Sequence, residues 1–241
     1  NTIIYIIIIV KCNSRFIFTI KRAENMLDIK NCDCMEYMAT MPDKWADLAI
    51  VDPPYFKDVG KFGYFVEKIS NTNVARGNYS IPNWNHNIPG KEYLSELCRV
   101  SKNQIIWGIN YYNFFHCVGR IVWDKMNDSS SFSKCEIASC TLHDSVQIYR
   151  FMWNGMLQGD MKNKEKRIHP TQKPVALYEW LLTKYAKKGD KILDTHGGSM
   201  SIAIAAWNLG FDLTLCELDK DYFEAGKKRV EWHMKQKRLL L

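Results

Sequence analysis

The sequence predicts an α/β protein built on a doubly wound, mostly parallel sheet. Short apolar runs alternate with helical segments, and several of these runs end in an acidic residue. The 241 residues are 46% hydrophobic and 24% charged, which fits a globular chain with one large domain and excludes disordered, collagen-like and coiled-coil proteins. We therefore expect a parallel sheet with helices on both of its faces.

The first two thirds of the chain supplies four predicted strands and one helix. Residues 46–52 are an apolar run that ends at Asp52 and meets Pro53, where a loop must begin. Residues 57–90 are polar and lack periodicity, and a loop of this length inside a domain is usually functional. The other predicted elements are a helix at 91–100 and strands at 103–109, 120–125 and 145–153.

The last third alternates helix and strand. Its predicted elements are a helix at 175–186, a strand at 191–194, a helix at 199–209, a strand at 212–217 and a helix from 219 to about 237. An apolar stripe marks the first of these helices, and Gly210 is placed to cap the second.

Residues 1–25 precede Met26, where a recognisable fold begins. The apolar run from Ile3 to Val10 is shorter than the roughly 20 residues of a membrane span, and its basic residues follow it, the reverse of a secretory signal. We expect residues 1–25 to be an atypical N-terminal extension or a start-site artefact. An added β-strand or an anchor is the alternative. Residues 26–241 are expected to form a single domain.

The eight cysteines include no C-x-x-C pair, and the closest spacing, Cys32-x-Cys34, is poor for tetrahedral zinc. Cys135, Cys140 and His143 could be imagined as ligands, but buried free thiols are the simpler interpretation. We expect a reducing, intracellular protein without a metal site.

Asp52-Pro53-Pro54-Tyr55 combines groups that suit an amine on a planar ring. Asp52 supplies an acceptor oxygen, and Pro53, which has no N–H, leaves a carbonyl without a competing local donor. The two prolines stiffen the turn, and Tyr55 offers a π-face. Two acceptors pull a conjugated amine toward a tetrahedral shape, and the carboxylate stabilises the positive charge that develops on nitrogen. The alternative is a plain turn between a strand and a loop.

The strand at 191–194 enters the turn His196-Gly197-Gly198 and then a helix. This arrangement brings backbone N–H groups close to a ligand, and Glu217 at the end of the next strand suits ribose hydroxyls. Asp194 would repel a phosphate but suits a cation such as an amino-acid ammonium. A purely structural turn is the alternative, and the missing third Gly disfavours a dinucleotide oxidoreductase.

Three motifs occur in a distinctive order, and they are Asp52-Pro53-Pro54-Tyr55, the segment His169 to Pro174 (HPTQKP) and the segment Asp194 to Ser199 (DTHGGS). From Met26 to Lys237 the chain thus resembles the S-adenosylmethionine-dependent amino-methyltransferases of DNA, in their β-type motif order. The resemblance implies a seven-stranded, Rossmann-like methyltransferase sheet in circularly permuted order. It also implies a cytoplasmic enzyme, bacterial or phage-encoded, of a restriction-modification system.

In that family Asp-Pro-Pro-Tyr goes mostly with adenine, so the expected reaction is methyl transfer from S-adenosylmethionine to adenine N6 in DNA after base flipping. The alternatives are methylation of cytosine N4 or of an RNA amine, or a catalytically degenerate protein that only binds DNA or the cofactor. The implied catalytic residues are Asp52, Pro53, Pro54 and Tyr55. The implied cofactor-binding residues are Asp33, Phe56, His169, Thr171, Lys173, Asp194, His196, Gly197, Gly198, Ser199 and Glu217.

The resemblance also assigns individual roles. Asp194 and the Gly197-Gly198 turn would hold the methionine part of the cofactor, Glu217 its ribose and Asp33 its adenine, and Lys173 could pair with its carboxylate. We expect His196 to be structural rather than a general base, because this chemistry needs none.

Met200 departs from the family pattern, which usually has Gly there. It would narrow the cofactor space if this backbone needs a positive φ, or it could point into the core.

DNA is the expected partner, and the net charge of +7 permits it. Residues 157–191 carry nine Lys or Arg against four acids and are the candidate DNA face. The segments at about 57–90 and 126–165 are the predicted target-recognition insertions, and both are small. We therefore expect a short target, or a homodimer or a partner restriction subunit, with no membrane involved.

Overall fold

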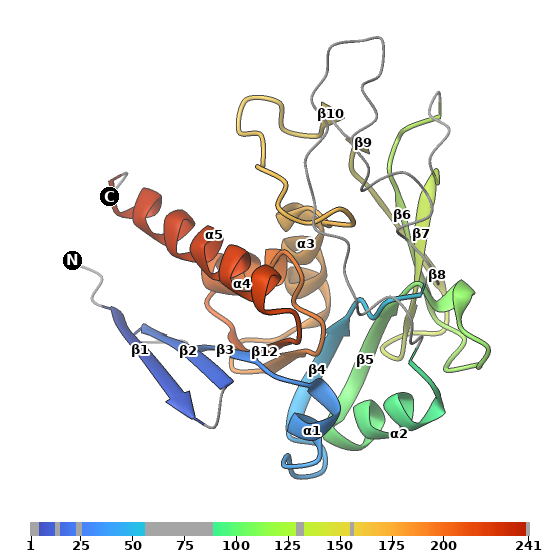
Figure 1. The fold of residues 1–241 in the computed structure, drawn as a ribbon. Coiled ribbons are helices and arrows are strands. Elements are labelled where there is room, and N and C mark those ends of the chain that lie inside the picture. The colour runs from blue at the N-terminus through green and yellow to red at the C-terminus, as the bar shows by residue number, and fades with distance from the viewer. Residues whose placement is uncertain are drawn as a thin grey trace.

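A computed structural model describes residues 5–12, 15–22, 26–55, 89–128, 133–154 and 157–239. Ten strands form one sheet in the order β1-β2-β3-β12-β11-β4-β5-β7-β6-β8, and β9 and β10 form a separate hairpin (Figure 1). The strands are β1 (Tyr5–Cys12), β2 (Arg15–Arg22), β3 (Met26–Asn31), β4 (Ala46–Val51), β5 (Ser101–Trp107), β6 (Arg120–Asp124), β7 (Cys135–Cys140), β8 (Val146–Arg150), β9 (Trp153–Asn154), β10 (Leu157–Gln158), β11 (Lys191–Asp194) and β12 (Asp212–Glu217). The helices are α1 (Cys34–Met38), α2 (Lys91–Val100), α3 (Val175–Tyr185), α4 (Ser201–Leu209) and α5 (Lys220–Leu239).

The predicted fold class is confirmed. In the main sheet only β2 and β7 run against the other strands, so the sheet is mostly parallel. β12, from the end of the chain, lies between β3 and β11, as a permuted order requires. The sheet is wider than seven strands because β8 extends one edge and the β1–β2 hairpin extends the other.

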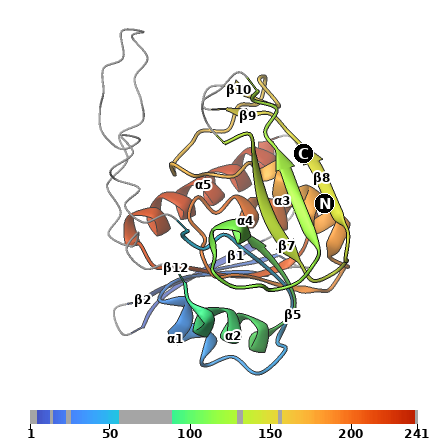
Figure 2. The same cartoon turned by 90° about the vertical axis from the view of Figure 1, so that its right-hand side faces the viewer.

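Helices cover both faces of the sheet. α1 and α2 lie on one face, and α3, α4 and α5 lie on the other (Figures 1 and 2). Successive residues of β5 belong to different cores, since Trp107 packs with the α3–α4 side and Ile106 with the α1–α2 side. Burial on both faces explains why the central strands are continuous apolar runs rather than alternating ones.

Some elements differ from the predictions. β3, α1 and β7 were not predicted as elements. β7 and β8 lie within the segment 126–165 predicted as an insertion, yet both belong to the main sheet. At the N-terminus, β2 pairs with β3 along its length, with Phe18 and Ile20 fully buried, which is the arrangement that the alternative of an added strand describes. Most of the long segment 57–90 lies outside the described residues, as does Phe56.

The helix ends match their sequence signals. Gly210 caps α4 in the left-handed conformation (φ 77°), as predicted, and Asp33 caps α1 by accepting from the backbone N–H of Met35 at 2.7 Å. Within the described ranges, no helix is long and apolar enough to cross a membrane.

Candidate active site

The acidic residues predicted for the site lie at the carboxyl ends of four neighbouring parallel strands. Asp33 follows β3, Glu217 ends β12, Asp194 ends β11 and Asp52 follows β4. Carboxyl ends of parallel strands are where α/β sheets bind ligands. Asp52 and Glu217 both contribute to the raised pKa of Asp194, so all three carboxyl groups lie close enough to interact.

The two carboxylate oxygens of Asp52 differ in their hydrogen bonding. Lys173 Nζ pairs with Oδ2, whereas Oδ1 is buried and has no hydrogen-bond partner among the described residues. Burial raises the pKa of Asp52, Lys173 opposes this effect, and Glu136 adds to it. An unpartnered buried acceptor is costly unless a ligand uses it.

Glu136 is a site residue that the sequence interpretation missed. It lies on β7, which runs antiparallel to β6 and so begins at the same edge of the sheet, opposite Trp123. Its carboxylate pairs with Lys173 at 2.9 Å and with Lys125 at 2.6 Å. Burial would raise the pKa of Glu136, but the two lysines lower it to about 2. Glu136 is therefore ionised.

Lys173 forms ion pairs with two carboxylates of the chain. Its side chain is 2% exposed, and its ammonium lies between Asp52 and Glu136, 5.6 Å from the centre of the Trp107 ring. Burial would lower its pKa, yet the two carboxylates raise it well above its usual value. Two carboxylates of the chain hold the ammonium in this structure, and the implied pairing with the cofactor's carboxylate stays a prediction.

The Pro53 carbonyl accepts a hydrogen bond within the protein. No local donor was expected for this carbonyl, but Tyr112 Oη, which is distant in sequence, donates to it at 2.9 Å. A carbonyl oxygen has two lone pairs, so it can still accept a second bond. Tyr55 stacks on Tyr111 with its ring centre 4.7 Å away. Gly108 is confined here, since a Cβ would lie 2.3 Å from the Tyr55 ring.

The turn after β11 is held by backbone hydrogen bonds to the two acids beside it. His196 N–H donates to Asp194 Oδ1 at 3.0 Å, and Gly198 N–H donates to Glu217 Oε2 at 2.6 Å. Gly197 is sterically required, because a Cβ there would lie 2.3 Å from Leu215. The sequence therefore forms the predicted turn with its glycines in close contact with β12.

Both acids of this turn are buried without a cation beside them strong enough to keep them ionised. Burial raises the pKa of Asp194 to about 8 and that of Glu217 to about 7. Such a pair suits a ligand that brings a positive charge to one carboxyl group and hydroxyl donors to the other. S-adenosylmethionine carries an ammonium, a sulfonium and ribose hydroxyls, so the residues present fit it.

His196 and His169 are both neutral at physiological pH. Burial lowers the pKa of His196 to about 4 and that of His169 to about 3. His196 Nδ1 lies 2.9 Å from Thr195 Oγ1, which in turn lies 2.6 Å from Tyr93 Oη, an arrangement that fits the structural role expected for His196. His169 packs its ring on Tyr222, and its Nδ1 accepts from the Thr171 backbone N–H at 3.3 Å.

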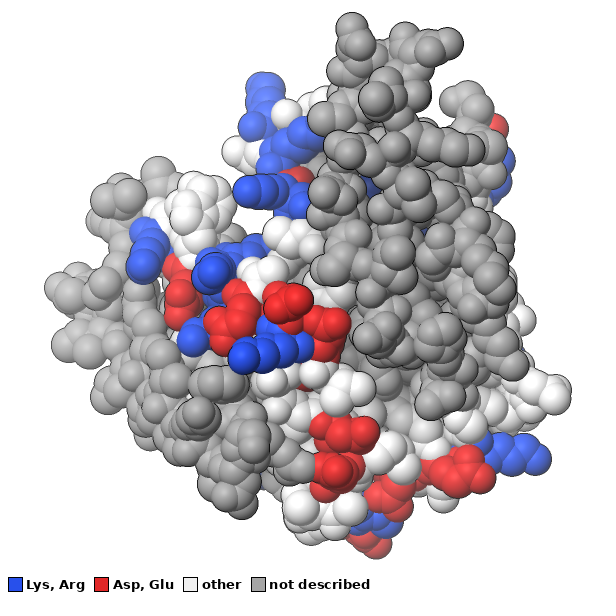
Figure 3. All heavy atoms as spheres, viewed as in Figure 1, with Lys and Arg blue, Asp and Glu red and all other residues white. Residues whose placement is uncertain are grey.

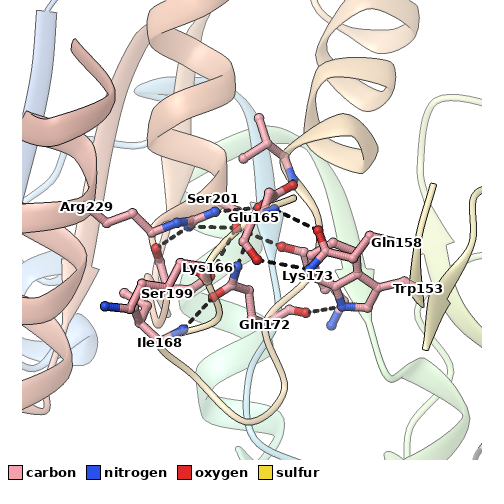
Figure 4. A network of polar contacts seen from close by, with 11 residues as sticks. Trp153, Gln158, Glu165, Lys166, Ile168, Gln172, Lys173, Ser199, Ser201 and Arg229 are labelled. Carbon is pink, nitrogen blue, oxygen red and sulfur yellow. Dashed lines mark hydrogen bonds and ion pairs between the residues drawn. The ribbon is translucent and has the colours of Figure 1, made fainter. Parts of the chain in front are cut away.

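The segment 169–174 is held against the glycine turn by a polar network around Glu165 (Figure 4). Arg229 of α5 pairs with Glu165 at 2.5 Å and donates to the Ser199 carbonyl at 2.7 Å. Gln172 accepts from Ile168 N–H at 3.0 Å. Ser201 donates to the Lys173 carbonyl at 2.7 Å. The sequence interpretation missed Glu165 and Arg229, which carry no motif signature.

Met200 has the positive φ that the glycine of the family pattern suggested, at 56°. Its side chain is nevertheless fully buried and packs on Gly226 of α5, where a Cβ would lie 2.7 Å from Met200 Cγ. Of the two alternatives, a position in the core is therefore the one observed. Gly226 provides the space that Met200 fills.

This pairing predicts a reversal of sign in a double-mutant cycle. Gly226→Ala alone should destabilise the protein, because the new methyl group clashes with Met200. In a Met200→Gly background the same change should stabilise it by about 1 kcal/mol, since it fills the vacated space and removes a glycine from a helix interior. Met200→Gly alone should lower stability by about 2 kcal/mol, because lost burial exceeds the relief of backbone strain. Thermal unfolding of the four proteins measures the cycle, and equal effects in both backgrounds would contradict it.

Basic side chains gather on the segment that joins β10 to α3 (Figure 3). Lys162, Lys164 and Lys166 are exposed there. In the described part of the chain, no group of three or more His, Cys, Asp or Glu residues is placed to hold a metal ion.

Comparisons with known proteins identify the family of the chain. The DNA methylase family, N6_N4, matches residues 46–228. The chain is 24% identical over 247 residues to the Type II methyltransferase M2.DpnII of Streptococcus pneumoniae, covering 86% of this chain and 91% of that protein. It is 25% identical over 240 residues to the Type II methyltransferase M2.MboI of Moraxella bovis, covering 82% and 85%.

Solved structures share the fold. The cytosine-N4-specific PvuII DNA methyltransferase superposes with a TM-score of 0.55 at 12% identity, covering 87% of this chain and 90% of that one. The complex of M1.HpyAVI with S-adenosylmethionine gives a TM-score of 0.50 at 19% identity, covering 85% and 100%. The family match spans β4, the strand ends at Asp52, Asp194 and Glu217, and the first nine residues of α5, and so includes most of the site. The chain therefore belongs to the N6/N4 DNA methylase family and is an S-adenosylmethionine-dependent DNA methyltransferase.

Proposed function

We propose that this enzyme methylates the exocyclic N6 of adenine in DNA, on a base flipped out of the duplex. The observation that carries the proposal is the open Oδ1 of Asp52, a buried acceptor beside a carbonyl that can take a second hydrogen bond. When bound, S-adenosylmethionine supplies an electrophilic methyl group. The protein must add hydrogen-bond acceptors that make a conjugated amine nucleophilic.

The chain's own groups suit that task. Asp52 Oδ1 and the Pro53 carbonyl accept the two amine protons, which favours a tetrahedral nitrogen, and the Asp52 carboxylate stabilises its developing positive charge. Tyr55 offers its ring to the base, and Pro54 stiffens the turn. No strong base is needed, because the amine proton becomes acidic once nitrogen carries a positive charge.

We assign the cofactor to the carboxyl ends of β3, β11 and β12, beside the Asp52 turn. Asp194 and the Gly197-Gly198 turn would hold its methionine part, Glu217 its ribose and Asp33 its adenine. His169, Thr171, His196 and Ser199 would shape the wall around it. The raised pKa values of Asp194 and Glu217 support this assignment, because a cation and hydroxyl donors are what these buried carboxyl groups lack.

Transfer of a labelled methyl group from S-adenosylmethionine to unmethylated DNA, followed by nucleoside mass analysis, tests the proposal. The expected product is N6-methyladenine, and Asp52→Ala should abolish it while cofactor binding persists. N4-methylcytosine as the product would replace adenine with cytosine as the target. Full activity in Asp52→Ala would remove Asp52 from the catalytic role.

Neutralising the exposed lysines before the HPTQKP segment should weaken DNA binding without slowing chemistry. In the triple variant Lys162→Ala, Lys164→Ala, Lys166→Ala, we expect KM for DNA to rise and the slope of log K against log salt to fall by about 2–3, since each phosphate contact contributes about 0.9. The kcat at saturating DNA should stay unchanged.

The matched control neutralises three exposed lysines of α5, Lys220, Lys228 and Lys235. That variant should keep the wild-type salt slope. If both triple variants reduce the slope equally, the basic segment is not a specific DNA face.

We infer that the enzyme works as a homodimer, or beside a restriction subunit. β7 and β8, eleven residues of the predicted recognition segment 126–165, belong to the main sheet, which shortens the part of it that can read a target. A second copy adds DNA-contacting surface. Sedimentation with and without duplex DNA tests this, and a monomer in both conditions that methylates DNA alone would contradict it.

A further inference from the structure

Four charged side chains meet at the catalytic aspartate in alternating order. Asp52 pairs with Lys173, Lys173 with Glu136 at 2.9 Å, and Glu136 with Lys125 at 2.6 Å. All four are mostly buried, with side-chain exposures between 2% and 19%. Their formal charges cancel.

Stability alone does not account for such a cluster. Buried ion pairs lose most of their Coulomb energy to desolvation, and apolar residues of similar volume often serve as well. Here the chain of charges ends at a carboxylate whose other oxygen is buried and has no hydrogen-bond partner in the part of the chain that the structure describes. A costly arrangement that ends at an unsatisfied acceptor is typical of a functional site.

Glu136 changes how strongly Lys173 acts on Asp52. With Glu136 ionised, the ammonium is shared between two carboxylates. Without it, Lys173 would pair with Asp52 alone, and the site would carry a net positive charge that opposes the positive charge developing on the amine. Lys125 has the opposite effect, because it draws Glu136 away from Lys173.

We propose that Glu136 is a positioning residue for methyl transfer, which shares the Lys173 ammonium and so keeps Asp52 a strong acceptor with Oδ1 turned to the substrate amine, while Lys125 sets how far that sharing goes. The inference rests on the proposed role of Asp52. Other groups also face the cluster, namely Tyr55, Tyr112 before β6, Tyr178 of α3 and Asp194 at the end of β11. All of them remain in every variant below, so differences between variants report the charges of Glu136 and Lys125.

Three variants test the proposal, namely Glu136→Gln, Lys125→Gln and the double variant. Glu136→Gln should lower kcat by about 10–100-fold with KM for DNA and cofactor within about twofold, since the net positive charge that it leaves at the site opposes the positive charge developing on the amine in the transition state. The acid limb of its kcat–pH profile should move to lower pH, because Asp52 loses a neighbouring negative charge.

Lys125→Gln should move the acid limb of the kcat–pH profile to higher pH, because Asp52 loses a neighbouring positive charge. The double variant restores neutrality, so its limb should return toward the wild-type position and kcat should recover in part.

A structural role would give a different pattern. If both single variants lose activity with the acid limb unmoved, or if the double variant is worse than either, the charge-sharing role is overturned. Wild-type kcat and pH profile in Glu136→Gln would overturn it as well. Glu96→Gln is the matched control, since it breaks a surface ion pair with Arg99 at 2.9 Å far from the cluster, and it should leave kcat unchanged.

Two further proteins keep the outcome clear. If Glu136→Gln fails to fold, Glu136→Asp keeps the charge and should leave the acid limb in place, and a limb shifted to lower pH would overturn the proposal. Asp52→Ala distinguishes failure of the proposed function from failure of the proposed role of Glu136. Activity in Asp52→Ala would refute the proposed function, whereas an inactive Asp52→Ala beside an unaffected Glu136→Gln would refute only the role of Glu136.

Discussion

Lys173→Met is expected to lower kcat by about 10³-fold and to destabilise the protein by about 3–5 kcal/mol. The variant leaves Asp52 and Glu136 facing each other with no cation between them, and Lys173 is almost completely buried, so water cannot replace it. Burial and the neighbouring Glu136 already raise the pKa of Asp52, and loss of Lys173 raises it further. A protonated Asp52 cannot stabilise positive charge on the amine.

Thermal unfolding and kcat measured from pH 6 to pH 9 check this result. Part of the lost activity should return at high pH, where Asp52 ionises again. Lys102→Met is the control, because Lys102 forms a 2.6 Å ion pair with Asp47 but is 55% exposed, and pairs of that kind contribute little. A Lys173→Met protein as stable and active as the control would show that the cluster has no influence on the site.

The motifs of the site could be predicted because each follows a strand with a strong apolar pattern. β4, β11 and β12 are mainly apolar strands. Asp52 follows β4, and Asp194 and Glu217 end β11 and β12, and parallel strands bring their carboxyl ends together whatever the order of the chain. The helix bounds followed in the same way, with α3 starting directly after Pro174 and α4 ending at Gly210.

Glu136 could not be predicted, because it depends on the direction of β7. The sequence around it, Cys135 to Cys140, has no alternating pattern, and nothing local says that this strand runs antiparallel between β5 and β6. Reversal of one strand is what brings its amino end, with Glu136, to the edge where the other strands end. The ion pair between Lys173 and Glu136 could not be predicted for the same reason.

The position of the Met200 side chain could not be predicted from the sequence for a different reason. The sequence suggested that a positive φ here would crowd the cofactor, and the φ is indeed positive. The side chain, however, goes to the core because Gly226 on α5 leaves room for it. These two residues are 26 positions apart, so the compensation is visible only in three dimensions.

The ligand-free enzyme should become less stable as pH rises from about 6 to 9. Burial raises the pKa of Asp194 from 3.8 to about 8 and that of Glu217 from 4.5 to about 7. Between the unfolded and folded pKa values the unfolded chain binds fewer protons than the folded one, so the free energy of unfolding falls with rising pH until both groups are ionised. We expect Tm to fall by about 5–10 °C over this range.

A bound cation reverses this trend, because it favours the ionised form of Asp194. Affinity for S-adenosylmethionine should therefore tighten as pH rises toward 8, more so in the wild type than in Asp194→Asn, and comparison of the two removes the titration of the cofactor's own amine. Asp194→Asn should bind the cofactor about 10–100-fold more weakly at pH 8. Without ligand, the same variant should be more stable than the wild type at pH 9, since the amide has no ionisation to penalise the fold.

Calorimetric titration and thermal unfolding across the pH range measure both effects, with Asp221→Asn as an exposed control that should follow the wild type. The effects of Asp194→Asn on stability without ligand and on cofactor affinity are expected to be opposite. A carboxyl group that weakens the empty fold and strengthens the loaded one is placed for its ligand rather than for stability. If Asp194→Asn is less stable than the wild type at high pH and binds the cofactor equally well, Asp194 serves the turn through its bond to the His196 N–H, and the cofactor's cation must be held elsewhere.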